Sequence, residues 1–273
     1  EHWFYFEGGV LKTIYSPTLD QKINIILNFA FVASFYWNAT DEKVEIDIAD
    51  ERHGISMSPA THLSQHIKDG AYHVSGLSLG GITADGSGDD DFEAQYSVSN
   101  GQYNDEDLSH VIDYVAVGDS IPVVYNIDSD QKLRSEINPT FPVLSAPAGR
   151  LYYNEWTGTT WQLTEVPDRD FCCYHTFAFN GQGVGIISVM GQAVYATAAA
   201  ARTGSETEIA NIKSQLPFPE LIPLATTIWE TRNSYDNGVK SRIRTVDGED
   251  YRSWIGETIS GGSAPSSHTN LTD

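Results

Sequence analysis

Hydrophobic and polar residues alternate with a period of two along most of the chain, which is the pattern of half-buried β-strands. HWFYF (2–6) and VLKTIY (10–15) flank two glycines and predict a hairpin. The apolar run 23–37 is broken by polar residues, and its aromatic and β-branched content favours a buried strand pair. VEIDI (44–48) adds another strand. We therefore expect a small antiparallel sheet over residues 1–49.

One helix follows this sheet. The segment PATHLSQHIKDG (59–70) has Ser58 as N-cap, Pro59 at the first helical position and Gly70 as the terminating glycine. After it the period-two pattern returns. It predicts further strands within AYHVSGLSLGGIT (71–83), EAQYSVSNGQY (93–103), LSHVIDYVAV (108–117) and SIPVVYNI (120–127).

The second half repeats hairpin patterns around one helical stretch. The Ala-rich segment 193–202 predicts a helix, Gly204 interrupts it, and a capping box of Ser205 and Glu208 predicts a restart. The predicted strand pairs are the aromatic hairpin 150–166, the strands 171–180 and 184–191, and the strands 221–232 and 238–247.

These elements predict an α+β protein, mainly antiparallel β with a few short helices. We divide the chain into an N-terminal β region (1–56), a central β-rich domain (57–190) and a C-terminal α/β region (191–258). Residues 259–273 have the composition of a flexible tail. The first residue is Glu1 rather than Met, so we expect this sequence to be part of a longer chain.

The formal charge of −21 argues against nucleic acid and anionic lipid as partners, because both would be repelled. The sequence has no run of about 18 apolar residues, so we expect no membrane span. The two cysteines, Cys172 and Cys173, are adjacent, and a strand points neighbouring side chains to opposite faces. We therefore expect both thiols to be reduced.

A serine hydrolase is one candidate activity, because GLSLG (76–80) matches the G-x-S-x-G nucleophile elbow with Ser78 as nucleophile. The elbow needs a helix directly after it, and GITADGSGDDD cannot form one. We expect Ser78 not to be a nucleophile and the segment to be a strand edge with glycine bends.

Two clusters have ligand types that suit metal ions. His62 and His66 lie four residues apart on one helix face, with His53 as a third candidate, although such histidines are more often surface residues or subunit contacts. Asp85, Ser87 and Asp89 alternate as in a calcium loop. Their spacing is not that of an EF-hand, and a solvated acidic turn is the default. We expect no cofactor, and calcium at this loop is the alternative that stays open.

The aromatic hairpin carries the features of a carbohydrate site. Glu155 and Glu165 lie across it, beside Trp156 and Trp161. Two carboxylates with stacking tryptophans could serve a glycosidase, or the tryptophans alone could stack on a bound glycan. The alternative is that these aromatic residues form cross-strand pairs within the sheet.

The polar segment ADERHG (49–54) directly follows a predicted strand. Asp50, Glu51, Arg52 and His53 could form a catalytic cluster, or they could form charge-assisted hydrogen bonds that fix a structural corner, with Gly54 relieving the backbone. We favour the structural corner, because Ser58 and Pro59 begin a helix immediately afterwards.

The segment ADERHG followed by ATH (60–62) resembles a group of tailed-bacteriophage virion structural proteins, fibre-like or spike-like components of the particle. The resemblance covers most of residues 1–254. Further segments similar to that group are HWFYFEGGVL, YWNATDEKV, GLSLGGITADGSG, NEWTGTTWQLTEV, MGQAVYATAAAAR, LPFPELIPLATTIWET and SRIRTVDGEDYRSW.

The resemblance implies a non-enzymatic structural protein located in the virion, a tail or head fibre or spike with a role in host attachment. It implies other virion proteins as partners and a homo-oligomer, with a trimer favoured. Two alternatives remain open: a polysaccharide-degrading enzyme, and a non-catalytic module that binds host surface glycan.

Overall fold

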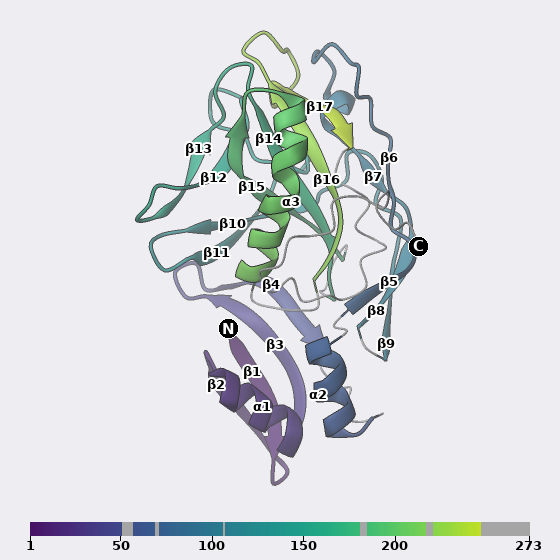
Figure 1. The fold of residues 1–273 in the computed structure, drawn as a ribbon, viewed down its shortest axis with the longest axis vertical. Coiled ribbons are helices and arrows are strands. Elements are labelled where there is room, and N and C mark those ends of the chain that lie inside the picture. The colour runs from purple at the N-terminus through teal and green to yellow at the C-terminus, as the bar shows by residue number, and fades with distance from the viewer. Residues whose placement is uncertain (51–56, 69–70, 106, 181–184, 217–220, 247–273) are drawn as a thin grey trace, which may run out of the picture.

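The computed structural model describes residues 1–50, 57–68, 71–105, 107–180, 185–216 and 221–246 (Figure 1). Within these ranges a four-stranded sheet lies at one end, a six-stranded sheet forms the larger body, and three smaller sheets complete the fold. Nearly all strand pairs are antiparallel, and the helices are few. The expected α+β class, mainly antiparallel β, is confirmed.

The N-terminal sheet has the strand order β2-β1-β3-β4 and is antiparallel throughout. Gly8 and Gly9 join its first two strands with positive φ angles of 58° and 78°, which suits a two-residue hairpin turn. The sheet expected over residues 1–49 is thus confirmed. Its strands are β1 (His2–Glu7), β2 (Val10–Tyr15), β3 (Ala30–Asn38) and β4 (Lys43–Asp50).

The strand pair expected over residues 23–37 is only half right, because α1 (Leu19–Asn28) forms the first part of that run. Thr18 and Gln21 make a capping box that starts the helix. Ile25 and Ile26 are buried against one face of the sheet. In an apolar run of this length, periodicity alone does not distinguish a helix from a strand. The capping box of Thr18 and Gln21 is the sequence signal that indicates a helix.

The second helix, α2 (Pro59–Lys68), lies beside α1, and the segment predicted as a helix is confirmed. The hydroxyl of Ser58 accepts a hydrogen bond from the amide of Thr61 at 3.2 Å, as an N-cap does. Gly70, expected to end the helix, lies outside the described residues.

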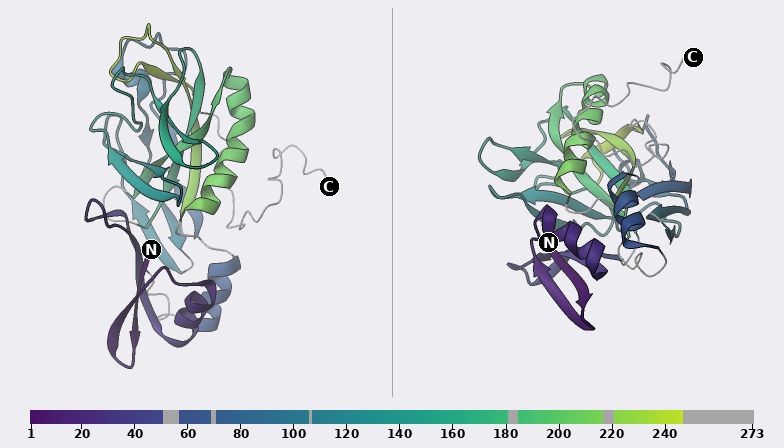
Figure 2. Two further views of the ribbon diagram at one scale, coloured as in Figure 1. Left: turned by 90° about the vertical axis from the view of Figure 1, so that its left-hand side faces the viewer. Right: turned by 60° about the horizontal axis from the view of Figure 1, so that its bottom comes forward.

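The six-stranded sheet has the order β11-β10-β15-β14-β16-β17, and only β10 and β15 pair in parallel. The main hydrophobic core lies between one face of this sheet and the smaller sheets around it. A helix covers the other face (Figures 1 and 2). The strands are β10 (Pro122–Ile127), β11 (Lys132–Ile137), β14 (Phe171–Ala178), β15 (Ile186–Tyr195), β16 (Ile222–Thr231) and β17 (Ser241–Val246). The sheet therefore combines strands from the regions expected as central and C-terminal.

The covering helix, α3 (Ala198–Gln215), is continuous through Gly204, so the expected break and restart are wrong. Thr197 caps its N-terminus by accepting a hydrogen bond from the amide of Ala200. Ile209 and Ile212 pack on the sheet. Glu208 makes no capping box with Ser205, because its carboxylate points to the sheet instead.

The smaller sheets surround the large one. The sheet β5-β8-β9 and the pair β6-β7 lie on one side, and the hairpin β12–β13 lies on another (Figure 1). The strand expected over 108–117 ends at Ile112, and Val115 forms only an isolated bridge with Val98. The bounds are β5 (Ala71–Gly76), β6 (Leu79–Gly80), η2 (Asp91–Ala94), β7 (Ser97–Val98), β8 (Gly101–Asp105), β9 (Leu108–Ile112), β12 (Tyr152–Trp156) and β13 (Trp161–Glu165).

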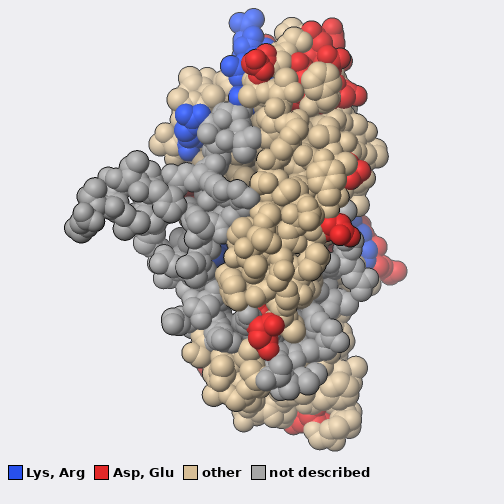
Figure 3. All heavy atoms as spheres, turned by 90° about the vertical axis from the view of Figure 1, so that its right-hand side faces the viewer, with Lys and Arg blue, Asp and Glu red and all other residues tan. Residues whose placement is uncertain are grey.

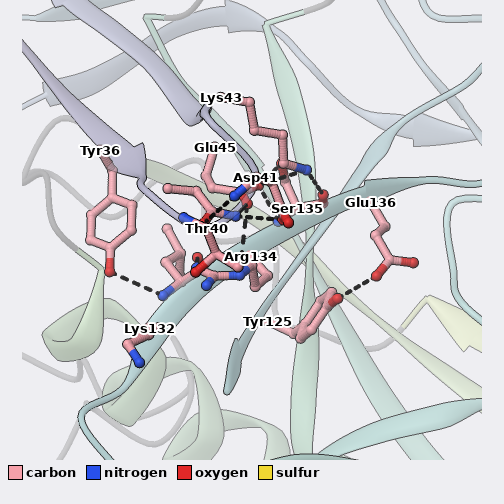
Figure 4. Close-up of polar contacts among 12 residues, drawn as sticks. Tyr36, Thr40, Asp41, Lys43, Glu45, Tyr125, Lys132, Arg134, Ser135 and Glu136 are labelled. Carbon is pink, nitrogen blue, oxygen red and sulfur yellow. Dashed lines mark hydrogen bonds and ion pairs between the residues drawn. The ribbon is translucent and has the colours of Figure 1, made fainter. Parts of the chain in front are cut away.

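A buried carboxylate joins the N-terminal sheet to the larger body (Figure 4). Glu45 on β4 accepts hydrogen bonds from the amide and the hydroxyl of Ser135 on β11, each at 2.7 Å. Its side chain is fully buried, and Asn38 also donates to it. Lys43 and Arg134 lie 3.2 Å and 3.9 Å from it and supply the opposite charge.

Both cysteines are free and buried, and they enter different clusters of the core, as alternation along a strand requires. Burial raises the pKa of both thiols. Among the described helices, none has the length and apolar character needed to cross a membrane.

Candidate functional site

An open groove of about 1070 Å³ lies between the hairpin β12–β13, the turn that joins β10 to β11, the end of β15, and α3. Its surface combines aromatic rings, side-chain amides and two carboxylates. The lining residues are Gln131, Tyr153, Glu155, Trp156, Trp161, Gln192, Ala193, Val194, Tyr195, Gly204, Thr207, Glu208, Asn211 and Gln215.

The two tryptophans of the hairpin lie directly opposite each other across its strands. Their ring centroids are 5.4 Å apart, with the planes inclined at 43°. Trp161 is 6% exposed, whereas Trp156 is 44% exposed. The cross-strand pair is therefore real, and it also holds the Trp156 ring at the groove with Trp161 as its buried support.

Glu155 is fixed by its neighbours on the hairpin. It accepts hydrogen bonds from the hydroxyl of Thr164 at 2.6 Å and from the side-chain amide of Gln162 at 2.9 Å. These bonds favour the carboxylate form and lower the pKa of Glu155. The group is therefore an ionised hydrogen-bond acceptor rather than a proton donor at neutral pH.

Glu165 does not join Glu155 as a carboxylate pair. Glu155 lies opposite Gln162 and Glu165 lies opposite Tyr152, so the alternation of side chains places the two acids on opposite faces of the hairpin. Glu165 instead forms an ion pair with Arg150, at 2.5 Å. The two acids that the sequence placed across the hairpin thus do not face one ligand.

A second carboxylate, Glu208, lines the groove from α3. It accepts hydrogen bonds from the Tyr195 hydroxyl at 2.5 Å and from the amide of Gln192 at 2.8 Å. The Nε2 atom of His175 lies 3.3 Å away, and Nδ1 of that ring lies 2.8 Å from the hydroxyl of Thr226. Burial and the charge of Glu208 raise the pKa of Tyr195.

The hydrogen-bonded series Thr226–His175–Glu208 has the order of a catalytic triad. Its burial inside the protein argues for a structural role instead. The side chain of His175 is fully buried, and Thr226 is buried as well. The sequence gives no sign of the cluster, because its members come from three separate elements and Glu208 fits the pattern of a capping box with Ser205. No local signal could have joined them.

Amide side chains form the wall of the groove below the hairpin. The Gln192 amide donates to the carbonyl oxygen of Gln215 at 2.7 Å, and Asn126 donates to the same oxygen at 3.3 Å. The main-chain amide of Asn126 donates to the side-chain oxygen of Asn154, and the side-chain amide of Asn154 donates to the main-chain oxygen of Asn126, each at 2.8 Å. The wall is therefore prearranged by a hydrogen-bonded network rather than by loose surface side chains.

Ser78, the serine of the G-x-S-x-G pattern, lies away from the groove and is not followed by the helix of a nucleophile elbow. Ser78 exchanges hydrogen bonds with Ser99, through the hydroxyl groups and the Ser78 amide, each at 3.0 Å. The short strand β6 follows it, and the next helical element in the chain is η2. The helix that the elbow requires after Gly80 is thus missing, as the sequence predicted.

The acidic loop that carries Asp85, Ser87 and Asp89 is organised around a buried acid, Glu93. The carboxylate of Glu93 accepts hydrogen bonds from the amides of Ser87 and Gly88. Figure 3 shows acidic side chains gathered at the end of the molecule where Figure 1 draws η2. The three candidate calcium ligands are all exposed residues of this loop.

Within the described ranges, no group of three or more histidine, cysteine or acidic side chains is placed to hold a metal ion. His62 is buried on α2, and the structure does not describe the side chain of His66. The calcium and histidine sites therefore stay predictions.

The ADERHG corner falls almost entirely outside the described residues. Asp50 is the last residue of β4, and its side chain is not described. Residues 51–56, with Glu51, Arg52, His53 and Gly54, are not described either, so the structural corner stays a prediction.

Comparison of the chain with models of protein families, with curated proteins and with solved structures finds no match.

Proposed function

We propose that this protein is a fibre-like or spike-like structural component of a tailed-bacteriophage particle that attaches to a host surface glycan through the groove beside β12–β13. The observation that carries the attachment is the half-exposed ring of Trp156 at the mouth of a groove with amide side chains in its wall. Aromatic rings stack on the apolar faces of sugars, and amides bond to sugar hydroxyls. The virion location is supported by the sequence resemblance.

Binding without hydrolysis fits the carboxylates of the groove better than catalysis does. A glycosidase needs a protonated acid and a second carboxylate facing the same bond. Glu155 is held in its ionised form by two donors. Glu208 is buried beneath Tyr195 and Gln192, which already occupy its oxygens, and Glu165 does not line the groove and is paired with Arg150.

The charge of the groove specifies the class of glycan. Its lining residues include two glutamates and no lysine, arginine or histidine. A glycan with uronic acid, sialic acid or phosphate groups would bring like charge to Glu155 without a cation to compensate it. The proposed ligand is therefore a neutral polysaccharide of the host surface.

Trp156→Ala tests the attachment. Calorimetric titration of the parent with neutral oligosaccharides of glucose, galactose and N-acetylglucosamine should reveal binding that the variant weakens by about five- to thirtyfold, since stacking on one aromatic ring contributes on the order of 1–2 kcal/mol. Trp37→Ala is the matched control, because Trp37 is 39% exposed but lies on the N-terminal sheet. It should bind like the parent.

Equal affinity of the parent and Trp156→Ala for every oligosaccharide bound would overturn the groove as the site. Release of shorter sugars from a host polysaccharide would instead favour the enzyme. Mass spectrometry of purified virions tests the structural role separately, since it should detect this chain together with other virion proteins. A homo-oligomer, with a trimer favoured by the resemblance, belongs to the same proposal.

A further inference from the structure

The strand β2 is the outer strand of the N-terminal sheet, and no described strand lies on its free side. Leu11 is 54% exposed and Tyr15 71% exposed, and nearly the whole strand is open to solvent. Figure 2 shows the hairpin β1–β2 projecting away from the larger body. An exposed edge strand with apolar side chains is a template for another strand, and monomeric proteins usually protect such edges.

The main-chain groups on the free side of β2 can be assigned from its pairing with β1. The amide of Ser16 donates to the carbonyl oxygen of Glu1 at 2.8 Å, so Ser16 points its main chain toward β1. Main-chain groups of an antiparallel strand alternate in direction. Leu11, Thr13 and Tyr15 therefore direct their amides and carbonyls outward.

These three residues are self-complementary. If a second copy of β2 runs antiparallel with Thr13 opposite its own counterpart, then Leu11 lies opposite Tyr15 of the other copy. All outward groups are then paired, and each pair exchanges two hydrogen bonds. A register shifted by two residues toward the turn would leave Tyr15 opposite Gly9, inside the turn. The register centred on Thr13 is thus the one that uses the whole edge.

The side chains agree with this register. Leu11, Thr13 and Tyr15 share a face with Phe4 and Phe35, whose rings lie 5.2 Å apart. Across the two-fold axis the exposed Leu11 would be covered by an exposed tyrosine, and Thr13 would face threonine, a favourable cross-strand pair. The uncovered aromatic face would then continue from one sheet into the other.

The charge of β2 also favours a second copy. The whole chain has a formal charge of −21, so most surfaces of two copies repel each other. The strand has one basic residue, Lys12, and no acid. In the register centred on Thr13 each Lys12 lies opposite Ile14 of the other copy, so the two lysines do not face each other.

From these features we infer that β2 is a contact between two copies of the chain, paired antiparallel about a two-fold axis at Thr13 to form one continuous eight-stranded sheet. This contact is independent of the glycan groove and does not rest on the proposed function. A two-fold contact joins copies in pairs and cannot close a ring of three, so in a trimeric assembly it would join one trimer to another.

Disulfide trapping tests the register directly. In Thr13→Cys the two introduced thiols lie opposite each other, within the Cα separation of about 4.4–6.8 Å that a disulfide spans. Mild oxidation should yield a covalent dimer on a non-reducing gel. Leu11→Cys is the matched control: its copies lie four residue steps apart, about 13 Å, and should remain uncrosslinked. Cys172 and Cys173 are buried in both variants and in the parent.

Sedimentation of the parent over micromolar concentrations should show reversible association, and Thr13→Lys should weaken it by about tenfold, because like charges then meet on the axis. Thr40→Lys adds the same charge to an exposed turn residue and should associate like the parent. A parent that stays monomeric, or equal crosslinking of Leu11→Cys and Thr13→Cys, would overturn the inference. So would a closed trimer that Thr13→Cys fails to crosslink.

Discussion

Gly204 lies in the middle of α3, where glycine is less favourable than alanine by roughly 1 kcal/mol. The reason for a glycine at this position is steric. A Cβ atom at this position would meet the ring and hydroxyl of Tyr195 at distances near 2.2–2.4 Å. Since the Tyr195 hydroxyl donates to Glu208, the missing side chain lets the helix pass close over the wall of the groove.

Gly204→Ala should therefore destabilise the protein, although helix propensity alone predicts that alanine would increase its stability. We expect the melting temperature to fall, because either Tyr195 leaves its hydrogen bond or α3 moves away from the sheet. Thr203→Ala is the control, since Thr203 lies on the exposed side of α3 and should change stability little. A higher melting temperature for Gly204→Ala would show that Tyr195 does not constrain the helix.

At the scale of elements, the N-terminal sheet is held to the body largely through β4 and β11. Besides the bonds to Glu45, the Tyr36 hydroxyl accepts a hydrogen bond from the amide of Leu133, and Lys43 donates to the carbonyl oxygen of Ser135 (Figure 4). The contact is thus polar, and its central charge is fully buried. Removing one partner of such a cluster leaves the others uncompensated.

Glu45→Ala should loosen the N-terminal sheet from the body, at a cost of about 3–5 kcal/mol for breaking a buried ion-pair cluster. We expect limited proteolysis to cleave near the connection between the two parts far faster than in the parent. Glu7→Ala removes an exposed acid from the same sheet and should leave the cleavage rate unchanged. Equal protection of both variants would show that Glu45 does not join the two parts.

At the scale of the whole molecule, buried phenols make the fold sensitive to alkali. Burial raises the pKa of Tyr174 and Tyr195, and raises that of Tyr96 to about 12. In the unfolded chain these groups ionise near pH 10. Above that pH the unfolded chain releases protons that the folded chain keeps, so stability present below about pH 10 is lost as the pH rises toward the folded pKa values.

The melting temperature should consequently fall steeply between about pH 10 and pH 12, and tyrosinate absorbance should rise together with unfolding. For Tyr96 alone the free energy of unfolding lost is on the order of 3 kcal/mol. Tyr96→Phe should flatten the decline, whereas Tyr114→Phe, at an exposed position, should not. Identical pH profiles of the parent and Tyr96→Phe would contradict the assignment.

The sequence by itself determined the β-rich class, the hairpins and one helix. Their signals are local: two glycines at the turn after Glu7, the aromatic strands on either side of Gly158, and Ser58 with Pro59 at the start of α2. A turn residue fixes the direction of only the few residues around it, so these elements follow without knowledge of the rest. The cross-strand tryptophans followed for the same reason, since a hairpin sets its own register.

Only the tertiary structure decided which elements meet. The buried cluster of His175, Glu208 and Thr226 brings together β14, α3 and β16. The need for glycine at position 204 depends on the ring of Tyr195, which leaves no room for a Cβ atom there. Such contacts join residues distant in sequence, and hydrophobic periodicity reports which face of an element is buried but not which partner buries it.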